Sequence, residues 1–129
     1  MKNNNIVVLK FGGTSMGSAD SINLCVNVIE ERINENKKPF IVVSAISKMT
    51  DTLITMLDLA KNKKKQLLNE TFKNIKNRHF QILNDLTKNE ELKKVYSKKI
   101  GEKFLSLSEI LRGISLTGDY SNKMQANVL

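Results

Sequence analysis

The chain of 129 residues is poor in cysteine, proline and aromatic residues, with one cysteine, one proline, no tryptophan and only 5% aromatic residues. A single cysteine cannot form a disulfide within the chain, and Cys25 falls on the apolar side of an expected helix, as a small buried hydrophobe would. No apolar run approaches the about 20 residues of a membrane span, and the run after Asn5 is too short for a secretion signal. These absences predict a protein of the reducing cytoplasm with no membrane partner.

Acidic residues are also scarce, since 13 Asp and Glu face 21 Lys and Arg and leave a formal net charge of +8. Residues 61–104 hold 13 basic and five acidic residues, so this segment carries the whole surplus. Its basic residues are lysines apart from Arg78, and few aromatic residues accompany them, which is typical of a solvated surface. We therefore expect no nucleic-acid partner, although a non-catalytic binding module built on this basic segment is the alternative from another class.

The hydropathy pattern predicts a strand, a helix, a second strand and then helices. The apolar run Ile6–Leu9 is typical of a strand covered on both faces, and Pro39 precedes a second strand over 40–44. Between them a helix begins at Ser18 or Ser21 and runs to about Ile33, which makes a right-handed βαβ unit. Its two strand ends then lie side by side at the edge where open α/β sheets bind ligands.

Helical spacing continues after Thr50, with three further helices over about 53–60, 72–86 and 92–111. Gly101 is a weak point in the third of them. His79 lies on an apolar face with no second histidine or cysteine nearby, so we expect a packed histidine and no metal site. Gly118-Asp119 and Ser121 predict a turn and a cap before a last helix that begins near residue 122.

A lysine, glycines and hydroxyl residues follow the first strand in the order Lys10, Phe11, Gly12, Gly13, Thr14, Ser15. Glycines let backbone N–H groups approach an anion, and a lysine supplies a point charge, so the pattern indicates a phosphate site. It is not a Walker loop, because no Gly-Lys-Ser or Gly-Lys-Thr closes it, and Gly17 has the wrong spacing for a dinucleotide fingerprint. An ordinary glycine turn between strand and helix is the structural alternative, but a charged residue at the end of the strand, Lys10, favours the phosphate site.

Two blocks carry a resemblance to a known family. The first, Lys-Phe-Gly-Gly-Thr-Ser-Met over 10–16, resembles the amino-terminal signature of aspartate kinases, and the second, Val-Val-Ser-Ala-Ile-Ser-Lys-Met-Thr-Asp-Thr-Leu over 42–53, resembles their next segment. The resemblance implies an α/β fold with a doubly wound sheet of the amino-acid kinase (carbamate kinase-like) type. The chain is shorter than that domain, so we expect only its amino-terminal portion: a βαβ segment with the ligand loops over 1–60 and a mainly helical insertion over 61–129. The family's Gly-Glu substrate motif is expected beyond the last residue.

The resemblance also implies residue roles. Lys10 would be catalytic and would bind ATP together with Phe11, Gly12, Gly13, Thr14 and Ser15. Substrate would be bound by Ser44, Ala45 and Thr50. Ser44 could instead simply end a strand, and Thr50 is also a good helix N-cap. No protein ligand for a metal is expected, and Mg²⁺ would bridge the phosphate oxygens of ATP.

The activity that the resemblance implies is transfer of the γ-phosphoryl group of ATP to the side-chain carboxylate of L-aspartate, the first step toward lysine, threonine and methionine. The family's remaining substrate and catalytic residues lie farther along, so we expect the 129-residue piece alone to be inactive and the full-length protein to be a homo-oligomer. Two alternatives stay within enzymes: a bifunctional aspartate kinase–homoserine dehydrogenase, or another amino-acid kinase.

Overall fold

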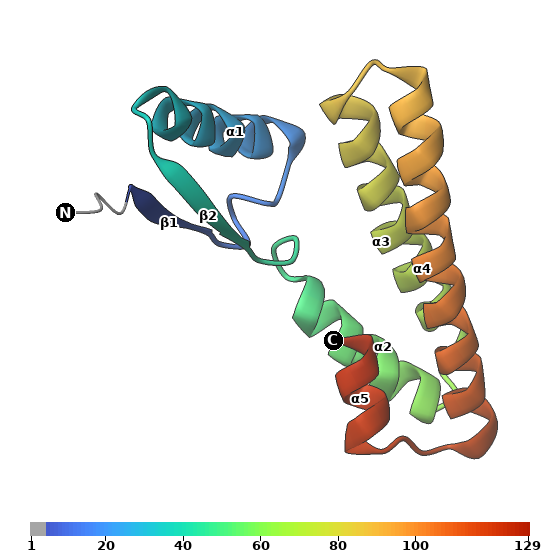
Figure 1. Ribbon diagram of the computed structural model, residues 1–129. Helices are drawn as coiled ribbons and strands as arrows, with labels where there is room; N and C mark the ends of the chain where they lie inside the picture. Colours follow the sequence, from blue (N-terminus) through green and yellow to red (C-terminus); the bar gives the residue numbers. More distant parts are fainter. Residues whose placement is uncertain (1–4) are drawn as a thin grey trace. The chain divides into compact units, whose positions relative to one another are not determined.

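The computed structural model describes residues 5–129, which form two compact units with the division between Lys48 and Met49. The first unit holds two strands and a helix, and the second holds four helices (Figure 1). The α/β class predicted from the sequence is therefore confirmed. None of the helices in residues 5–129 has both the length and the apolar character needed to cross a membrane.

The first unit is a parallel strand pair joined by a helix. Strand β1 (Ile6–Phe11) pairs with β2 (Lys38–Val43), with Ile6 opposite Lys38 and Phe11 opposite Val43. Both strands are longer than the sequence indicated: β1 continues through Lys10, and β2 begins before Pro39. Because parallel strands end at the same edge, the loops after Phe11 and Val43 leave the sheet together, as predicted.

Helix α1 (Ala19–Asn34) packs on both strands and connects them. Its N-cap is Ser18, whose hydroxyl oxygen accepts a hydrogen bond of 3.2 Å from the Ser21 backbone N–H. This settles which of the two serines caps the helix. Cys25 is buried, as expected, and its thiol donates to the Ser15 carbonyl oxygen at 3.8 Å, which joins the helix to the loop before it.

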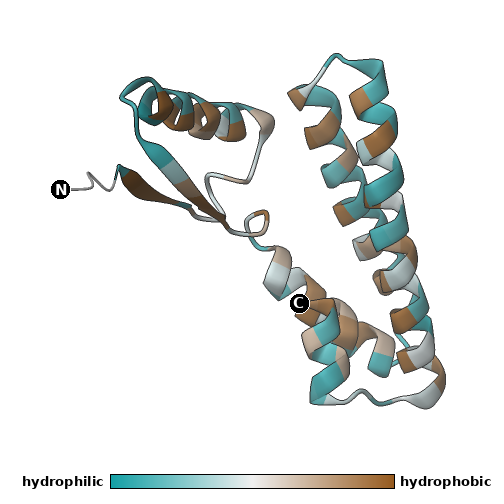
Figure 2. Cartoon of the chain, in the orientation of Figure 1, coloured by the Kyte–Doolittle hydropathy of each residue, from teal (hydrophilic) through white to brown (hydrophobic). Residues whose placement is uncertain are grey.

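The other face of the strand pair is open, and here the prediction that Ile6–Leu9 is covered on both faces is wrong for the described chain. Ile6, Val8 and Phe40 are 57%, 65% and 64% exposed. The physical reason is that α1 is the one helix that packs on this sheet within residues 5–48, and a single helix covers a single face. Figure 2 shows β1 as a nearly continuous hydrophobic strand.

The second unit consists of α2 (Met49–Lys61), α3 (Lys65–Leu86), α4 (Glu90–Thr117) and α5 (Asn122–Val128). Helices α2, α3 and α4 pack on one another, and Met56, Leu57 and Ile114 are fully buried between them. His79 is packed as expected: its ring meets that of Phe104 edge to face with centroids 5.2 Å apart, and its Nδ1 lies 2.7 Å from the Ile75 carbonyl oxygen.

Helices α4 and α5 begin at local sequence signals, whereas Lys64 before α3 makes no side-chain cap hydrogen bond. The Asn89 side chain accepts from the backbone N–H groups of Glu91 and Leu92, and Ser121 caps α5, as predicted. Gly118 ends α4 with a left-handed φ of 73°, a conformation that favours glycine. Gly101 does not interrupt α4, which runs through it without a break.

Candidate functional site

The loop after β1 folds back on itself through two backbone hydrogen bonds. The Met16 N–H donates to the Gly12 carbonyl oxygen at 3.2 Å, and the Gly17 N–H donates to that of Thr14 at the same distance. Among the described glycines only Gly118 has a positive φ. The backbone of the loop after β1 therefore does not adopt a left-handed conformation that would require glycine at positions 12, 13 or 17. Their role must come from what surrounds them.

That role is close approach to the loop that follows β2. A Cβ built on Gly13 would lie 3.3 Å from the Ser47 Cα and 3.4 Å from the Ala45 carbonyl oxygen. A Cβ on Gly17 would lie 3.4 Å from the Ser47 hydroxyl oxygen. The absence of a side chain at Gly13 therefore lets the two strand-end loops lie directly against each other, whereas the tightest contact of a Cβ on Gly17 would be with the Thr14 carbonyl oxygen of its own loop, at 3.2 Å.

Lys10 stands beside these loops on the penultimate position of β1, in register with Val42 of β2. The Lys10 side chain is exposed. Because successive side chains of a strand point to opposite faces, Lys10 lies on the open face of the sheet together with Val8, and Val7 and Leu9 lie on the other face. Among the residues described, no carboxylate forms an ion pair with Lys10. Neither 10–17 nor 44–48 contains an acidic residue, which leaves this sheet edge electropositive.

The expected substrate residues fall in both units. Ser44 and Ala45 are exposed directly after β2, beside the glycine loop. The Ser44 backbone N–H donates to the Phe11 carbonyl oxygen at 2.9 Å, so the side-chain hydroxyl is the group that Ser44 can offer a ligand. Thr50 belongs to the second unit, where it lies in the first turn of α2, one residue inside the helix and not at its N-cap.

The chemical groups at this edge suit phosphate better than a metal ion. Backbone N–H groups, hydroxyls and an ammonium are donors to anionic oxygen, whereas Mg²⁺ prefers carboxylates and other oxygen ligands. Within residues 5–129 no group of three or more His, Cys, Asp and Glu side chains is placed to hold a metal.

Two residues of this site were not singled out from the sequence. Ser47 makes the closest backbone approach to Gly13, and Gly17 accommodates the Ser47 hydroxyl. Gly17 was noted for its spacing alone. The available signal was a serine three residues after a strand end, next to a glycine loop expected at the same edge, but serine is too common in turns for that signal to be decisive.

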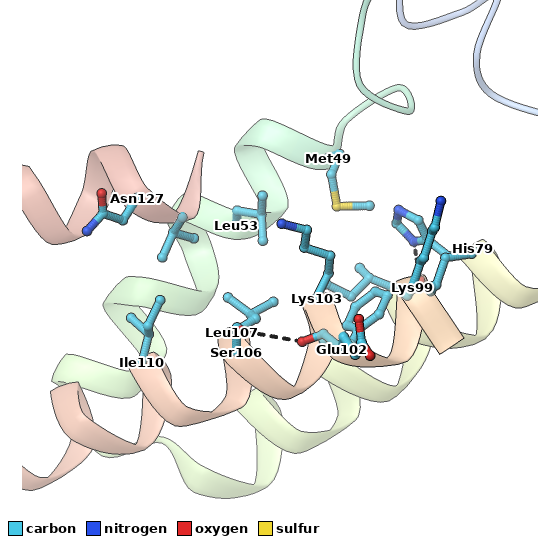
Figure 3. A pocket seen from close by; sticks show the side chains of 14 residues that line it. Met49, Leu53, His79, Lys99, Glu102, Lys103, Ser106, Leu107, Ile110 and Asn127 are labelled. Carbon is cyan, nitrogen blue, oxygen red and sulfur yellow. Dashed lines mark hydrogen bonds between the residues drawn. The ribbon is translucent and has the colours of Figure 1, made fainter. Parts of the chain in front are cut away.

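The second unit contains a separate cavity of about 590 Å³, bordered by α2, α3, α4 and α5. Figure 3 shows Met49 and Leu53 of α2 among its lining side chains, together with His79 of α3 and with Lys99 and Lys103 of α4. Glu102 also lines the cavity, so its charges are mixed. None of the residues expected to bind ATP or substrate lines it.

The family can be stated from comparison with known proteins. A sequence model described as the amino acid kinase family matches residues 5–121, so the chain belongs to this family. The α/β architecture, with a parallel pair of strands and a helical segment, agrees with the amino-terminal portion of such a kinase.

The curated proteins that it matches include aspartokinases, which confirms the resemblance carried by residues 10–16 and 42–53. The aspartokinase of Bacillus sp. (strain MGA3) is 51% identical over 57 residues, 43% of this chain and 13% of that protein. The aspartokinase of Chlamydia trachomatis serovar D is 38% identical over 80 residues, 62% of this chain and 17% of that protein. The chloroplastic bifunctional aspartokinase/homoserine dehydrogenase 1 of Zea mays is 30% identical over 114 residues, 86% of this chain and 12% of that protein. The matches therefore span between 12% and 17% of these relatives.

Proposed function

We propose that the chain is the phosphate-binding amino-terminal part of an aspartate kinase. The observation that carries the proposal is the contact of two strand-end loops at Gly13, next to Lys10, at a sheet edge without carboxylates. Proteins that transfer phosphoryl groups mainly position the donor and the acceptor and neutralise their charge. At this sheet edge the two adjacent loops can position the substrates, and Lys10 can neutralise charge. The similarity to aspartokinases supports L-aspartate as the acceptor.

In this proposal the donor phosphates are held by the loop after β1. The N–H groups and hydroxyls of residues 12–15, next to Phe11, contact the phosphate oxygens, and the Lys10 ammonium offsets the charge of the moving group. A side-chain carboxylate oxygen of aspartate forms a bond to the γ-phosphorus while the bond to the β,γ-bridging oxygen breaks. The products are 4-phospho-L-aspartate and ADP, the start of a route to lysine, threonine and methionine.

The acceptor side is assigned to Ser44 and Ala45 at the end of β2, and to Thr50. The Ser44 hydroxyl can donate to the aspartate carboxylate or to the transferred group, since its backbone N–H is already bonded to Phe11. Mg²⁺, carried by the nucleotide, would neutralise phosphate oxygens; the chain's own loop supplies donors and no metal ligand. In this proposal residues 1–60 hold the ligand loops, and residues 61–129 form a mainly helical segment.

Because the chain corresponds to a small part of its relatives, we propose that turnover belongs to the whole parent protein, acting in the cytoplasm as a homo-oligomer. An ATP-dependent aspartyl phosphate assay, with hydroxylamine trapping of the product, compares the parent with the 129-residue chain. We expect product from the parent alone. Turnover by the isolated chain would contradict its proposed inactivity.

The phosphate site is tested directly with tripolyphosphate, which has the triphosphate chemistry of ATP without adenine. In amide NMR spectra of the 129-residue chain, the resonances of Gly12, Gly13, Thr14 and Ser15 should shift on titration. The substitution Lys10→Ala should weaken binding about tenfold, because a charge-assisted contact to phosphate is lost.

The matched control is Lys38→Ala. Lys38 is also exposed, and its position in the register places it at the other end of the neighbouring strand. We expect the control to bind tripolyphosphate like the unaltered chain. Equal losses in both variants would show a general attraction to positive charge, and shifts confined to residues outside 10–17 and 44–48 would rule out the proposed site.

A further inference from the structure

A groove between α3 and α4 lies away from the glycine loop, in the second unit. Its volume is about 580 Å³, a size typical of small-molecule sites. It is formed where α3 begins and α4 approaches its end, because these two helices run antiparallel (Figure 1).

The floor of the groove is apolar. Leu68 and Leu111, which are 8% and 3% exposed, form it together with Phe72. Leu116 stands at the border and is 73% exposed, so an apolar body in the groove would remove its surface from water. These residues give the groove an affinity for hydrocarbon and no preference for charge.

The preference for charge comes from three cations that line the same groove: Lys63, Lys65 and Arg112. No acidic residue lines it, and within the described part of the chain none of the three forms an ion pair. The start of α3 carries the partial positive charge of a helix dipole and the end of α4 the partial negative charge, so these two contributions offset each other. The positive potential of the groove therefore arises from the side chains. Clustered cations without a counter-charge repel one another, and an anion in the groove would relieve that repulsion.

The cavity in Figure 3 lacks this combination. Its two lysines share the lining with Glu102, and the Lys99 ammonium already lies 5.3 Å from the centre of the Tyr96 ring. A ligand there would meet both signs of charge, whereas a ligand in the α3–α4 groove meets positive charge alone.

We propose that the α3–α4 groove binds a small organic anion with an apolar body, of the chemical class of medium-chain carboxylates. The carboxylate would accept from Arg112 and the two lysines, and the hydrocarbon chain would lie on Leu68, Leu111 and Phe72. A second copy of the chain does not fit these requirements, since its net charge of +8 has the same sign as the groove. Nucleic acid would leave the apolar floor unused.

The test is titration of the whole 129-residue chain with decanoate, followed by calorimetry and by NMR of the groove residues. Decanol and decyltrimethylammonium, with the same chain but a neutral or cationic head, should bind far more weakly. Arg112→Gln should reduce decanoate affinity about tenfold, as expected for loss of one charge-assisted hydrogen bond. Leu116→Ser should weaken binding through the apolar part without altering the fold, because this side chain is mostly exposed.

Lys98→Gln is the matched control, since this exposed lysine of α4 does not line the groove. Unchanged affinity in the control, with the helical circular dichroism of all variants preserved, supports the proposal. Equal binding of decanol, equal loss in Arg112→Gln and Lys98→Gln, or resonance shifts spread over all surface lysines would each overturn it. A short RNA that binds with the same sensitivity to Arg112→Gln while decanoate does not bind would also overturn it.

Discussion

At the scale of single residues, glycine has two distinct roles in this chain. Gly13 allows two loops to approach closely, whereas Gly118 supplies a left-handed φ at the end of a helix. The sequence predicted Gly13 in a ligand loop and suggested backbone freedom as its reason. The reason found in the structure is the neighbouring loop, which contains Ser47, a residue 34 positions farther along the chain.

We predict that Gly13→Ala destabilises the contact between the loops by about 1 kcal/mol, because its Cβ would press on the Ser47 backbone. Hydrogen exchange of the Ser44 amide, which bonds to Phe11, should be about fivefold faster as a result. Gly12→Ala is the comparison, since a Cβ at Gly12 meets no atom within 4 Å. Equal exchange rates of the Ser44 amide in the Gly13→Ala and Gly12→Ala variants would mean that the contact between the loops does not require glycine at position 13.

At the scale of elements, the helices begin and end where local chemistry allows. Ser18, Asn89 and Ser121 each accept backbone N–H groups at a helix start, and Gly118 closes α4. The sequence predicted the cap at Ser121 and the Gly118 turn, and it narrowed the cap of α1 to Ser18 or Ser21, because these signals act over a few residues. It also predicted a helix over about 92–111 with Gly101 as a weak point, and α4 runs through Gly101 because packing of a long helix outweighs the weakness of one glycine.

Gly101 and Gly118 should therefore respond oppositely to alanine. Gly101→Ala should raise stability by about 0.5–1 kcal/mol, since the site is helical and its Cβ meets nothing within 4 Å. Gly118→Ala should lower stability by about 1 kcal/mol, because alanine is strained at a φ of 73°. Urea unfolding followed by helical circular dichroism measures both, and shifts of the same sign would contradict the assignment.

At the scale of the whole molecule, side chains distant in sequence are tied together in the second unit. The Tyr120 hydroxyl donates to the Asp58 carboxylate at 2.9 Å, across 62 positions of the chain. Beside it the Lys61 ammonium lies 3.4 Å from the Asp119 carboxylate and 5.7 Å from the centre of the Tyr120 ring. This cluster joins α2 to the turn between α4 and α5.

The cluster predicts a pH dependence. The hydrogen bond to the Asp58 carboxylate is the main reason that the pKa of Tyr120 is raised above its usual range. The stabilisation from this bond is complete below the pKa of tyrosine in the unfolded chain, and it is lost as pH rises through the higher folded pKa. Above that pH the phenolate has no proton to donate.

Tyrosinate absorbance measures this directly in a Tyr96→Phe background, where Tyr120 is the remaining tyrosine. Adding Asp58→Asn should lower the pKa of Tyr120. Asp85→Asn is the control, because that carboxylate accepts from Gln81 on its own helix. If the pKa of Tyr120 is the same in the Asp58→Asn and Asp85→Asn variants, the hydrogen bond to Asp58 does not raise it.

The sequence by itself determined the order of strands and helices, the cap at Ser121, and the glycine loop with Lys10 beside it. Alternation, helical spacing and capping depend on neighbours within a few positions, so they can be recognised in the chain. Only the tertiary structure decided that Ser47 lies against Gly13, that one face of the strand pair is open, and that Lys63, Lys65 and Arg112 share an apolar groove. These features depend on which distant segments pack together, and the burial of apolar surface that drives this packing has no direction along the sequence.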